Sequence, residues 1–307
     1  MTANVWIWSV GLVLSLIGAP LLPGIVNRTK AFFAGRRGPS VFQLYRDLAK
    51  LLRRGGVFST ASRGVLALAP CASLAVLLTA AVLLPHFGCS SPLALAGDAV
   101  LFFYLLGTSR MIVVLAALDS GSSFEGMGAS REVQFSALVE AAIFGTVCFV
   151  FFAFRADSLS GIAAHCAVGG HAVSRALIAI AFFIVLLAEN CRVPVDDPDT
   201  HLELTMIHEA MILDYSGPDL ALIHYAASLK LWMFSVLLAA LTLPTPLPLA
   251  FQSLWFAVGV LLTGVMVGVA ESCMARLRFL KVPHILLGAL GLVLFGLFLR
   301  IFFEKGV

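Results

Sequence analysis

The sequence predicts an all-α integral membrane protein with about eight transmembrane helices and a cytoplasmic amphipathic helix. Of its 307 residues, 60% are hydrophobic and only 12% are charged, and the mean hydropathy is +1.00. Soluble domains carry about 25% charged residues. A soluble fold could not bury this much apolar surface, so lipid must surround most of the chain.

Eight apolar segments are long enough to cross a bilayer, whose core of about 30 Å needs roughly 20 helical residues. Lipid offers the backbone no hydrogen-bond partners, so these segments are expected to be helices within a single membrane domain over residues 1–307. The predicted spans are 5–26, 65–86, 98–118, 133–154, 172–190, 228–244, 250–271 and 283–303.

The placement of basic residues predicts the orientation. Fourteen Lys and Arg residues fall on one side of the predicted topology and four on the other. Basic loops stay in the cytoplasm, so we expect a multi-pass protein of the cytoplasmic (inner) membrane with both termini on the periplasmic side. The net charge of +3 is too small to indicate binding to nucleic acid.

No residue pattern indicates a metal or a prosthetic group on this chain. The six cysteines form neither a CxxC motif nor a Cys/His cluster. The acids near residue 197 superficially suggest a calcium loop but lack its glycine and its distal glutamate. The histidines and glutamates of 201–209 lack the HExxH spacing of a zinc hydrolase. Any redox centre is therefore expected on another subunit.

Residues 41–54 predict an amphipathic helix at the membrane interface. Apolar residues recur there at helical spacing, opposite a polar face. A simple electrostatic anchor to anionic lipid is one interpretation of this pattern. The apolar positions are Val41, Leu44, Tyr45, Leu48, Leu51 and Leu52, and the polar ones are Arg46, Asp47, Lys50, Arg53 and Arg54.

Three carboxylates lie in or at the margins of apolar spans. Because an ionised group at membrane depth costs several kcal/mol, such residues usually serve ion or proton paths. Glu140 lies well inside its span, and Glu189 closes the fifth. Glu271 lies near Arg276 and Arg278, and for it a role as a helix cap or a side chain that reaches toward the interface is favoured. Gly264 and Gly268 predict a face on which a partner helix packs closely.

The segment 189–204 concentrates polar groups between apolar helices. It holds five acids, one arginine and one histidine, and Pro194 and Pro198 force an irregular turn. Its many apolar residues argue against a freely solvated loop. The positive charge of Arg192 is expected to restrain the pKa of the nearby carboxyls of Glu189 and Asp196.

Four stretches resemble a known family. Residues 188–196 (AENCRVPVD) resemble the AExxRxPFD signature of the complex I subunit that joins the membrane arm to the peripheral arm, and of the matching anchor subunits of formate hydrogenlyase, hydrogenase-4 and related energy-converting [NiFe]-hydrogenases. The first loop (RGP at 37–39, then Gln43, Asp47 and KLL at 50–52), GASRE at 128–132 and DYSG at 214–217 match the family as well. Val195 and His201 replace a phenylalanine and a glutamate of the pattern.

The resemblance implies a non-catalytic subunit of an oxidoreductase complex. Iron–sulfur clusters in a neighbouring subunit would carry electrons, and a nickel–iron centre or a quinone in the partners would receive them. Iron–sulfur and large hydrogenase-like subunits would dock on the cytoplasmic side. Carboxylates of this chain would pass the charge change to antiporter-like membrane subunits, which move protons or sodium ions. Runs at 119–124 and 274–278 lean toward the hydrogenase branch.

The resemblance also assigns roles by position. The proton path comprises Glu140, Glu189, Arg192, Asp196, Asp199, His201, Glu203 and Asp214. A partner-docking face or quinone-like pocket comprises Arg36, Arg37, Gln43, Asp47, Arg131, Glu132 and Tyr215. Two alternatives stay open: a stand-alone proton-coupled transporter, and a quinone-reactive complex I-type subunit without hydrogenase activity.

Overall fold

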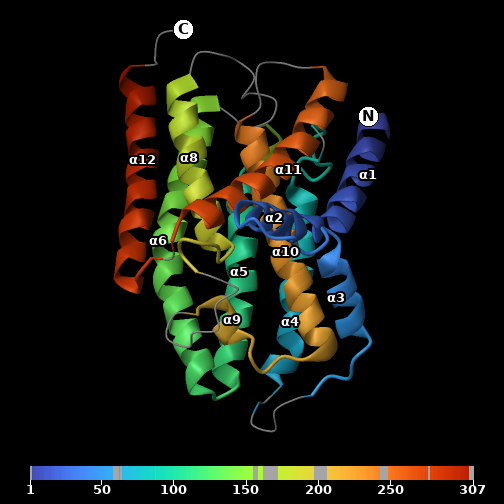
Figure 1. The fold of residues 1–307 in the computed structure, drawn as a ribbon. Coiled ribbons are helices and arrows are strands. Elements are labelled where there is room, and N and C mark those ends of the chain that lie inside the picture. Colours follow the sequence, from blue (N-terminus) through green and yellow to red (C-terminus); the bar gives the residue numbers. More distant parts are fainter. Residues whose placement is uncertain are drawn as a thin grey trace.

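The protein is an all-helical integral membrane protein. The computed structural model describes residues 2–57, 62, 64–86, 88–154, 158–161, 172–196, 206–242, 248–275 and 277–303. Within these ranges no strand forms, and the long apolar segments are helices that satisfy their backbone groups internally, as lipid requires. Helix α1 begins and helix α12 ends at the same end of the bundle (Figure 1).

The long helices occur in the order of the apolar segments, and α3 and α9 are short additional helices. The described helices are α1 (Thr2–Gly18), α2 (Leu21–Phe33), α3 (Gln43–Leu52), α4 (Val65–Leu83), α5 (Asp98–Asp119), α6 (Ser123–Phe154), α8 (Ala172–Glu189), α9 (His208–Met211), α10 (Gly217–Leu241), α11 (Leu249–Cys273) and α12 (Val282–Phe302), with a short 3₁₀ turn at Phe279–Lys281.

The bundle is built around α10. Of its apolar stretch 67% is buried inside the chain, against 22% for α12 at the periphery. Helices α2, α3, α4, α8 and α11 all pack against α10, and α12 covers α6 and α8. Six described helices are long and apolar enough to cross a membrane, or seven if the bent pair α1–α2 is one span. The predicted fifth span is the 18-residue helix α8.

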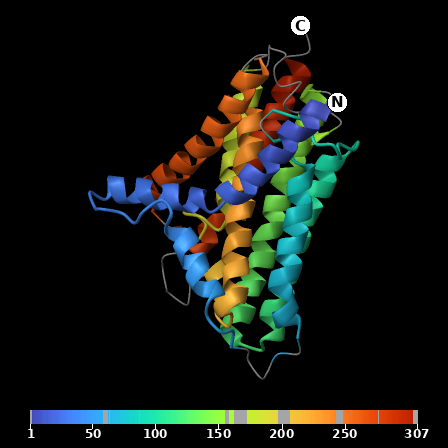
Figure 2. The ribbon, with the colours of Figure 1, turned by 90° about the vertical axis from the view of Figure 1, so that its right-hand side faces the viewer.

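The first predicted span, 5–26, is not one straight helix. Helix α1 ends at Gly18, and α2 begins after Pro20 with a change of direction of 48°. Proline lacks the N–H that a continuous helix would use, so the chain bends there. Helix α2 consequently projects sideways from the bundle (Figure 2).

Two helices begin earlier than the sequence predicts. Helix α6 starts at Ser123 instead of 133, and α10 starts at Gly217 instead of 228. The 32 residues of α6 exceed the roughly 20 that cross a bilayer, so its first turns extend beyond the apolar layer. These turns are polar and rich in glycine, which hid them from a reading based on hydropathy. They carry Arg131 and Glu132 into the protein.

The predicted amphipathic helix is confirmed as α3, and other helices of the chain cover its apolar face only in part. Helix α3 packs against α10 and α2. The Tyr45 hydroxyl donates a hydrogen bond to the backbone carbonyl of Ile17, at the end of α1. Helix α3 therefore connects the bend between α1 and α2 to the central helix α10.

The close-packing glycines of α11 serve a contact within the chain. Gly264 and Gly268 face α2, not a partner helix as predicted. A Cβ atom added at Gly268 would lie 2.6 Å from the Cβ atom of Thr29 and 3.0 Å from the carbonyl oxygen of Val26. Small residues allow this close crossing, as they do between membrane helices generally.

A pair of alanine variants tests this crossing. Gly268→Ala should lower the melting temperature of the detergent-solubilised protein, because overpacking costs about 1–3 kcal/mol. Gly288→Ala on α12 is the matched control: a Cβ there meets no atom within 4 Å, so the better helix propensity of alanine should leave stability equal or higher. Equal melting temperatures for the two variants would contradict the close crossing.

Candidate functional site

A buried chain of ion pairs joins four helices. Arg110 of α5 donates to Glu189 at the end of α8, with 2.6 Å between Nη1 and Oε1. The other terminal nitrogen of Arg110 donates to Glu140 of α6. The guanidinium is planar and presents several donors in fixed directions, so it suits two carboxylates at once. Arg110 thus links the two acids that the sequence singled out.

Lys230 of α10 extends the chain at its inner end. Its ammonium lies 2.7 Å from Glu189 Oε2 and donates to the backbone carbonyl of the same residue at 2.6 Å. The Glu189 side chain is only 3% exposed. One buried carboxylate is therefore held by two cations from two different helices. It is not an isolated acid among apolar neighbours, which was the basis of the sequence prediction.

Glu140 is the outer end of this series of ion pairs, at the surface of the bundle. Its side chain is 48% exposed, whereas that of Arg110 is 9% exposed. Large apolar residues of α5 and α6, among them Tyr104, Met111 and Phe152, are exposed as well. The order Glu140–Arg110–Glu189–Lys230 thus runs from the largely apolar side of the bundle formed by α5 and α6 into the interior.

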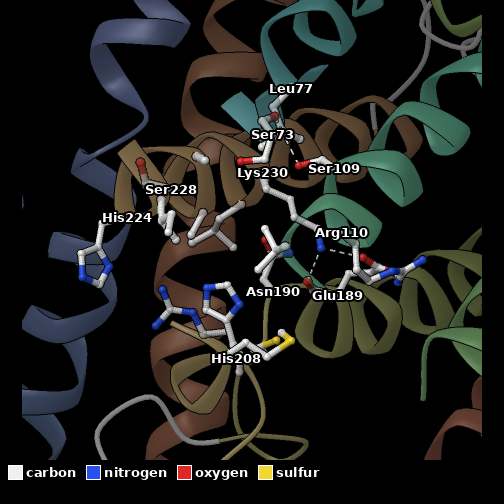
Figure 3. A pocket seen from close by; sticks show the side chains of 18 of the residues that line it. Ser73, Leu77, Ser109, Arg110, Glu189, Asn190, His208, His224, Ser228 and Lys230 are labelled. Atoms are coloured by element: carbon white, nitrogen blue, oxygen red, sulfur yellow. Dashed lines mark hydrogen bonds and ion pairs between the residues drawn. The ribbon is translucent and has the colours of Figure 1, made fainter. Parts of the chain in front are cut away.

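The inner end of the ion chain opens on a cavity of about 210 Å³. Figure 3 shows Arg110 and Glu189 on one side of it and the rings of His208 and His224 on the other, with Lys230 above. Its described lining also includes Glu132, Arg192 and Asp196, together with apolar residues of α4, α5 and α10. Four of the predicted site residues line this cavity, and Arg110 connects a fifth, Glu140, to it; the four are Glu132, Glu189, Arg192 and Asp196.

Asp196 holds the start of α9. Its Oδ2 accepts the backbone N–H of Ile207 at 3.1 Å and that of His208 at 3.2 Å. A carboxylate suits the unpaired amides of a helix start. Burial, followed by the nearby charges of Lys230, His224 and Arg192, lowers the pKa of His208 to about 4. His208 is therefore neutral at pH 7.

Arg192 does not face Glu189, contrary to the sequence prediction. Its Nη1 atom lies 3.5 Å from Oε1 of Glu271 on α11. The Glu271 side chain has no exposed area, and its second cation is Lys30 at 3.0 Å. Glu271 therefore neither reaches toward the interface nor simply caps its helix. It belongs to a second buried ion cluster.

The remaining predicted residues are dispersed. Arg131 donates to the carbonyl of Met206 at 3.0 Å, and the N–H of exposed Asp214 donates to Glu125 at 3.0 Å. Tyr215 is buried among apolar side chains. Gln43 and Asp47 hydrogen-bond to each other on α3, and Arg36 and Arg37 are exposed beyond α2. Asp199, His201 and Glu203 lie outside the described residues.

Sequence reasoning missed the cations of the ion chain. Arg110 and Lys230 lie within the predicted spans 98–118 and 228–244, but the sequence alone assigns them no role. A base in an apolar span needs a partner as much as an acid does, and that signal was present. His208 and His224 gave no such signal, because only the folded chain brings the two histidines to one cavity. Among the described residues, no group of three or more His, Cys, Asp or Glu could hold a metal ion.

Comparison with known proteins identifies the family. A family model described as NADH dehydrogenase matches residues 6–301. The chain belongs to this family. It is 33% identical over 281 residues to hydrogenase-4 component C of Escherichia coli (strain K12), covering 89% of this chain and 88% of the relative. It is 31% identical to formate hydrogenlyase subunit 4 of the same organism, covering 89% and 91%.

A solved structure shares the fold of this family member. It is a chain of the membrane-bound sulfane sulfur reductase, described as an archaeal respiratory membrane complex, with a TM-score of 0.81. The match covers 97% of this chain and 99% of the other at 16% sequence identity. Identity that low speaks for the fold alone.

The pKa of His208 predicts a pH dependence of stability. A histidine whose pKa falls from 6.5 to about 4 on folding binds fewer protons folded than unfolded between these values. Its contribution is present above pH 6.5 and is lost as the pH falls toward 4. His208→Gln should therefore flatten the decline of melting temperature between pH 7 and pH 5.

His284→Gln is the control, because His284 is exposed on α12. The slope should shrink without vanishing, because burial also lowers the pKa of His86 to about 4. Identical slopes for the wild-type protein and His208→Gln would contradict a lowered pKa of His208 in the folded protein.

Proposed function

We propose that this chain is the membrane subunit of a hydrogenase-type, complex I-like oxidoreductase. In this proposal it anchors iron–sulfur and large hydrogenase-like subunits on the cytoplasmic side and couples their electron transfer to ion translocation. The electron-carrying groups (iron–sulfur clusters, with a nickel–iron centre or a quinone) belong to the partners, and this chain binds none. The names of the two Escherichia coli relatives, components of hydrogenase-4 and of formate hydrogenlyase, support this class.

The observation that carries the proposal is the ion chain from the cavity to Glu140. A half-exposed carboxylate between exposed apolar residues is costly in contact with lipid. A neighbouring membrane subunit with polar groups would cover it at far lower cost. The lateral face of α5 and α6 is therefore proposed as the contact for an antiporter-like subunit.

Arg110 gives the ion chain a means to transmit a change of charge from the cavity to Glu140. It is shared between Glu189, which also holds Lys230, and Glu140. A change of charge at the cavity alters the balance between Lys230 and Glu189. Arg110 then shifts between its two carboxylates, which changes the electrostatic surroundings of Glu140. Every link is an existing contact, so no large movement of a helix is required.

The two alternatives draw on the same residues. A quinone-reactive subunit would use the cavity, whose lining offers apolar walls and the donors His208 and Arg192. A neutral quinone ring would leave most of the charged side chains that line the cavity without a role. The lining therefore favours charge transmission over quinone binding. A stand-alone transporter would need an ion path closed within one chain, yet the described path ends half exposed at Glu140.

Glutamine substitutions test the coupling. Glutamine keeps the shape of the acid but releases no proton, so Glu140→Gln and Glu189→Gln should reduce ion pumping of the purified complex by at least about tenfold. Electron transfer from a soluble donor within the partner subunits should keep its rate. Arg110→Gln should match these losses, because it disconnects the two acids.

The matched control is Glu209→Gln, an acid that also lines the cavity but is not part of the ion chain. Its pumping should stay within about twofold of the wild-type rate. Normal pumping by both Glu140→Gln and Glu189→Gln would remove these acids from the coupling path.

Cysteine labelling tests the proposed orientation. Ser40 and Pro92 are exposed between α2 and α3 and between α4 and α5. In a background without the native cysteines, Ser40→Cys should react only from the cytoplasm and Pro92→Cys from the periplasm, because basic loops stay inside. Labelling of position 40 by an impermeant reagent on intact cells would reverse the topology.

A further inference from the structure

The second ion cluster ties three separate elements to one carboxylate. Oε2 of Glu271 on α11 forms an ion pair with the ammonium of Lys30 on α2, at 3.0 Å. Its other oxygen accepts from Arg192, in the turn after α8, at 3.5 Å. The Glu271 side chain is fully buried, whereas Arg192 is 15% exposed and lines the cavity.

The fold delivers Glu271 to this place through the glycine face of α11. Gly264, Gly268 and Glu271 are spaced by four and three residues, so they lie on one face of the helix. The same face receives α2 in close contact, where Gly268 meets Thr29. Lys30 follows Thr29 directly. The crossing that excludes a side chain at position 268 therefore buries the carboxylate one turn later.

Stability does not explain a buried glutamate at this crossing. Removing a carboxylate and its partners from water costs several kcal/mol per ion, and well-packed apolar residues often replace such clusters without loss. What the cluster does provide is a fixed place for the guanidinium of Arg192. A backbone hydrogen bond from Leu277 to the carbonyl of Pro194, at 3.2 Å, joins the same two segments.

We propose that Glu271 is a positioning residue that holds Arg192 at the wall of the cavity and keeps it from Glu189 of the ion chain and from Asp196. Arg192 follows Glu189 by three residues, and its carbonyl accepts the N–H of Asp196 at 3.2 Å. Once freed from Glu271, the guanidinium has these two carboxylates as its nearest alternatives along the chain. Arg192 would then compete with Arg110 and Lys230 for the carboxylate of Glu189. The contacts that make up the ion chain would be disrupted.

A double-mutant cycle in the assembled complex tests the proposal, whose pumping readout rests on the proposed function. Glu271→Gln and Arg192→Gln should each lower pumping by about tenfold, and the double variant should be no worse than either single variant. Lys30→Gln removes the other ion pair but leaves Arg192 its partner, so pumping should stay within about twofold of wild type.

A second readout does not depend on activity. Phenylglyoxal modifies accessible guanidinium groups, and mass spectrometry of the purified complex can locate the product at residue 192. Modification should rise several-fold in Glu271→Gln and stay at the wild-type level in Lys30→Gln. If Glu140→Gln and Glu189→Gln pump normally, the proposed function fails, but a selective rise in labelling would still establish the positioning of Arg192.

Three results would overturn the proposal. If Glu271→Gln pumps normally and its Arg192 is modified only at the wild-type level, Arg192 does not need Glu271 as a partner. Losses that multiply in the double variant would show that the two residues act independently. Equal damage by Lys30→Gln would show that Glu271 only clamps α2 to α11.

Glu271→Asp guards against misfolding, because it keeps the charge on a side chain one methylene shorter. It should assemble and pump better than Arg192→Gln. A defect as large as that of Arg192→Gln would contradict a role based on the charge of Glu271.

Discussion

The arrangement of the bundle depends on how Arg110 is satisfied. A guanidinium that is 9% exposed in a predominantly apolar helix needs anionic partners, and removing one partner of a buried pair costs about 3–5 kcal/mol. Glu140 and Glu189 meet this need from two other helices, and Lys230 joins Glu189 from the central helix. The requirement therefore restricts how α5, α6, α8 and α10 slide and rotate against one another. Apolar packing alone would tolerate several such arrangements.

The sequence predicts what depends on local composition. Long apolar runs located the membrane helices, and the acids in those runs identified Glu140 and Glu189 correctly as residues in unusual surroundings. It does not predict what depends on which helices meet. Hydropathy placed Lys230 and Arg110 in their spans, but only the tertiary structure shows that both reach Glu189. For the same reason Arg192 was assigned to the nearest acids in the chain, whereas its partner Glu271 comes from another helix.

The same limit explains the errors in the fold. A hydropathy window averages over the break at Pro20 and reads α1 and α2 as one helix. The polar first turns of α6 fall below an apolar threshold although they are helical, and the first turns of α10 lie outside the predicted span 228–244 although they continue the same helix. The glycine pattern of α11 predicted close packing correctly but could not say that the partner helix belongs to the same chain.

The two ion clusters differ in a way that bears on their roles. The Glu271 cluster is closed, because its carboxylate is buried and both of its cations belong to this chain. The Arg110 cluster is open, because it begins at the cavity and ends on a carboxylate that is 48% exposed. A closed cluster can only hold its members in place, whereas an open one can pass a change of charge from one end to the other. Because the open end is half exposed on the side formed by α5 and α6, the proposed charge path requires a second membrane protein against these two helices.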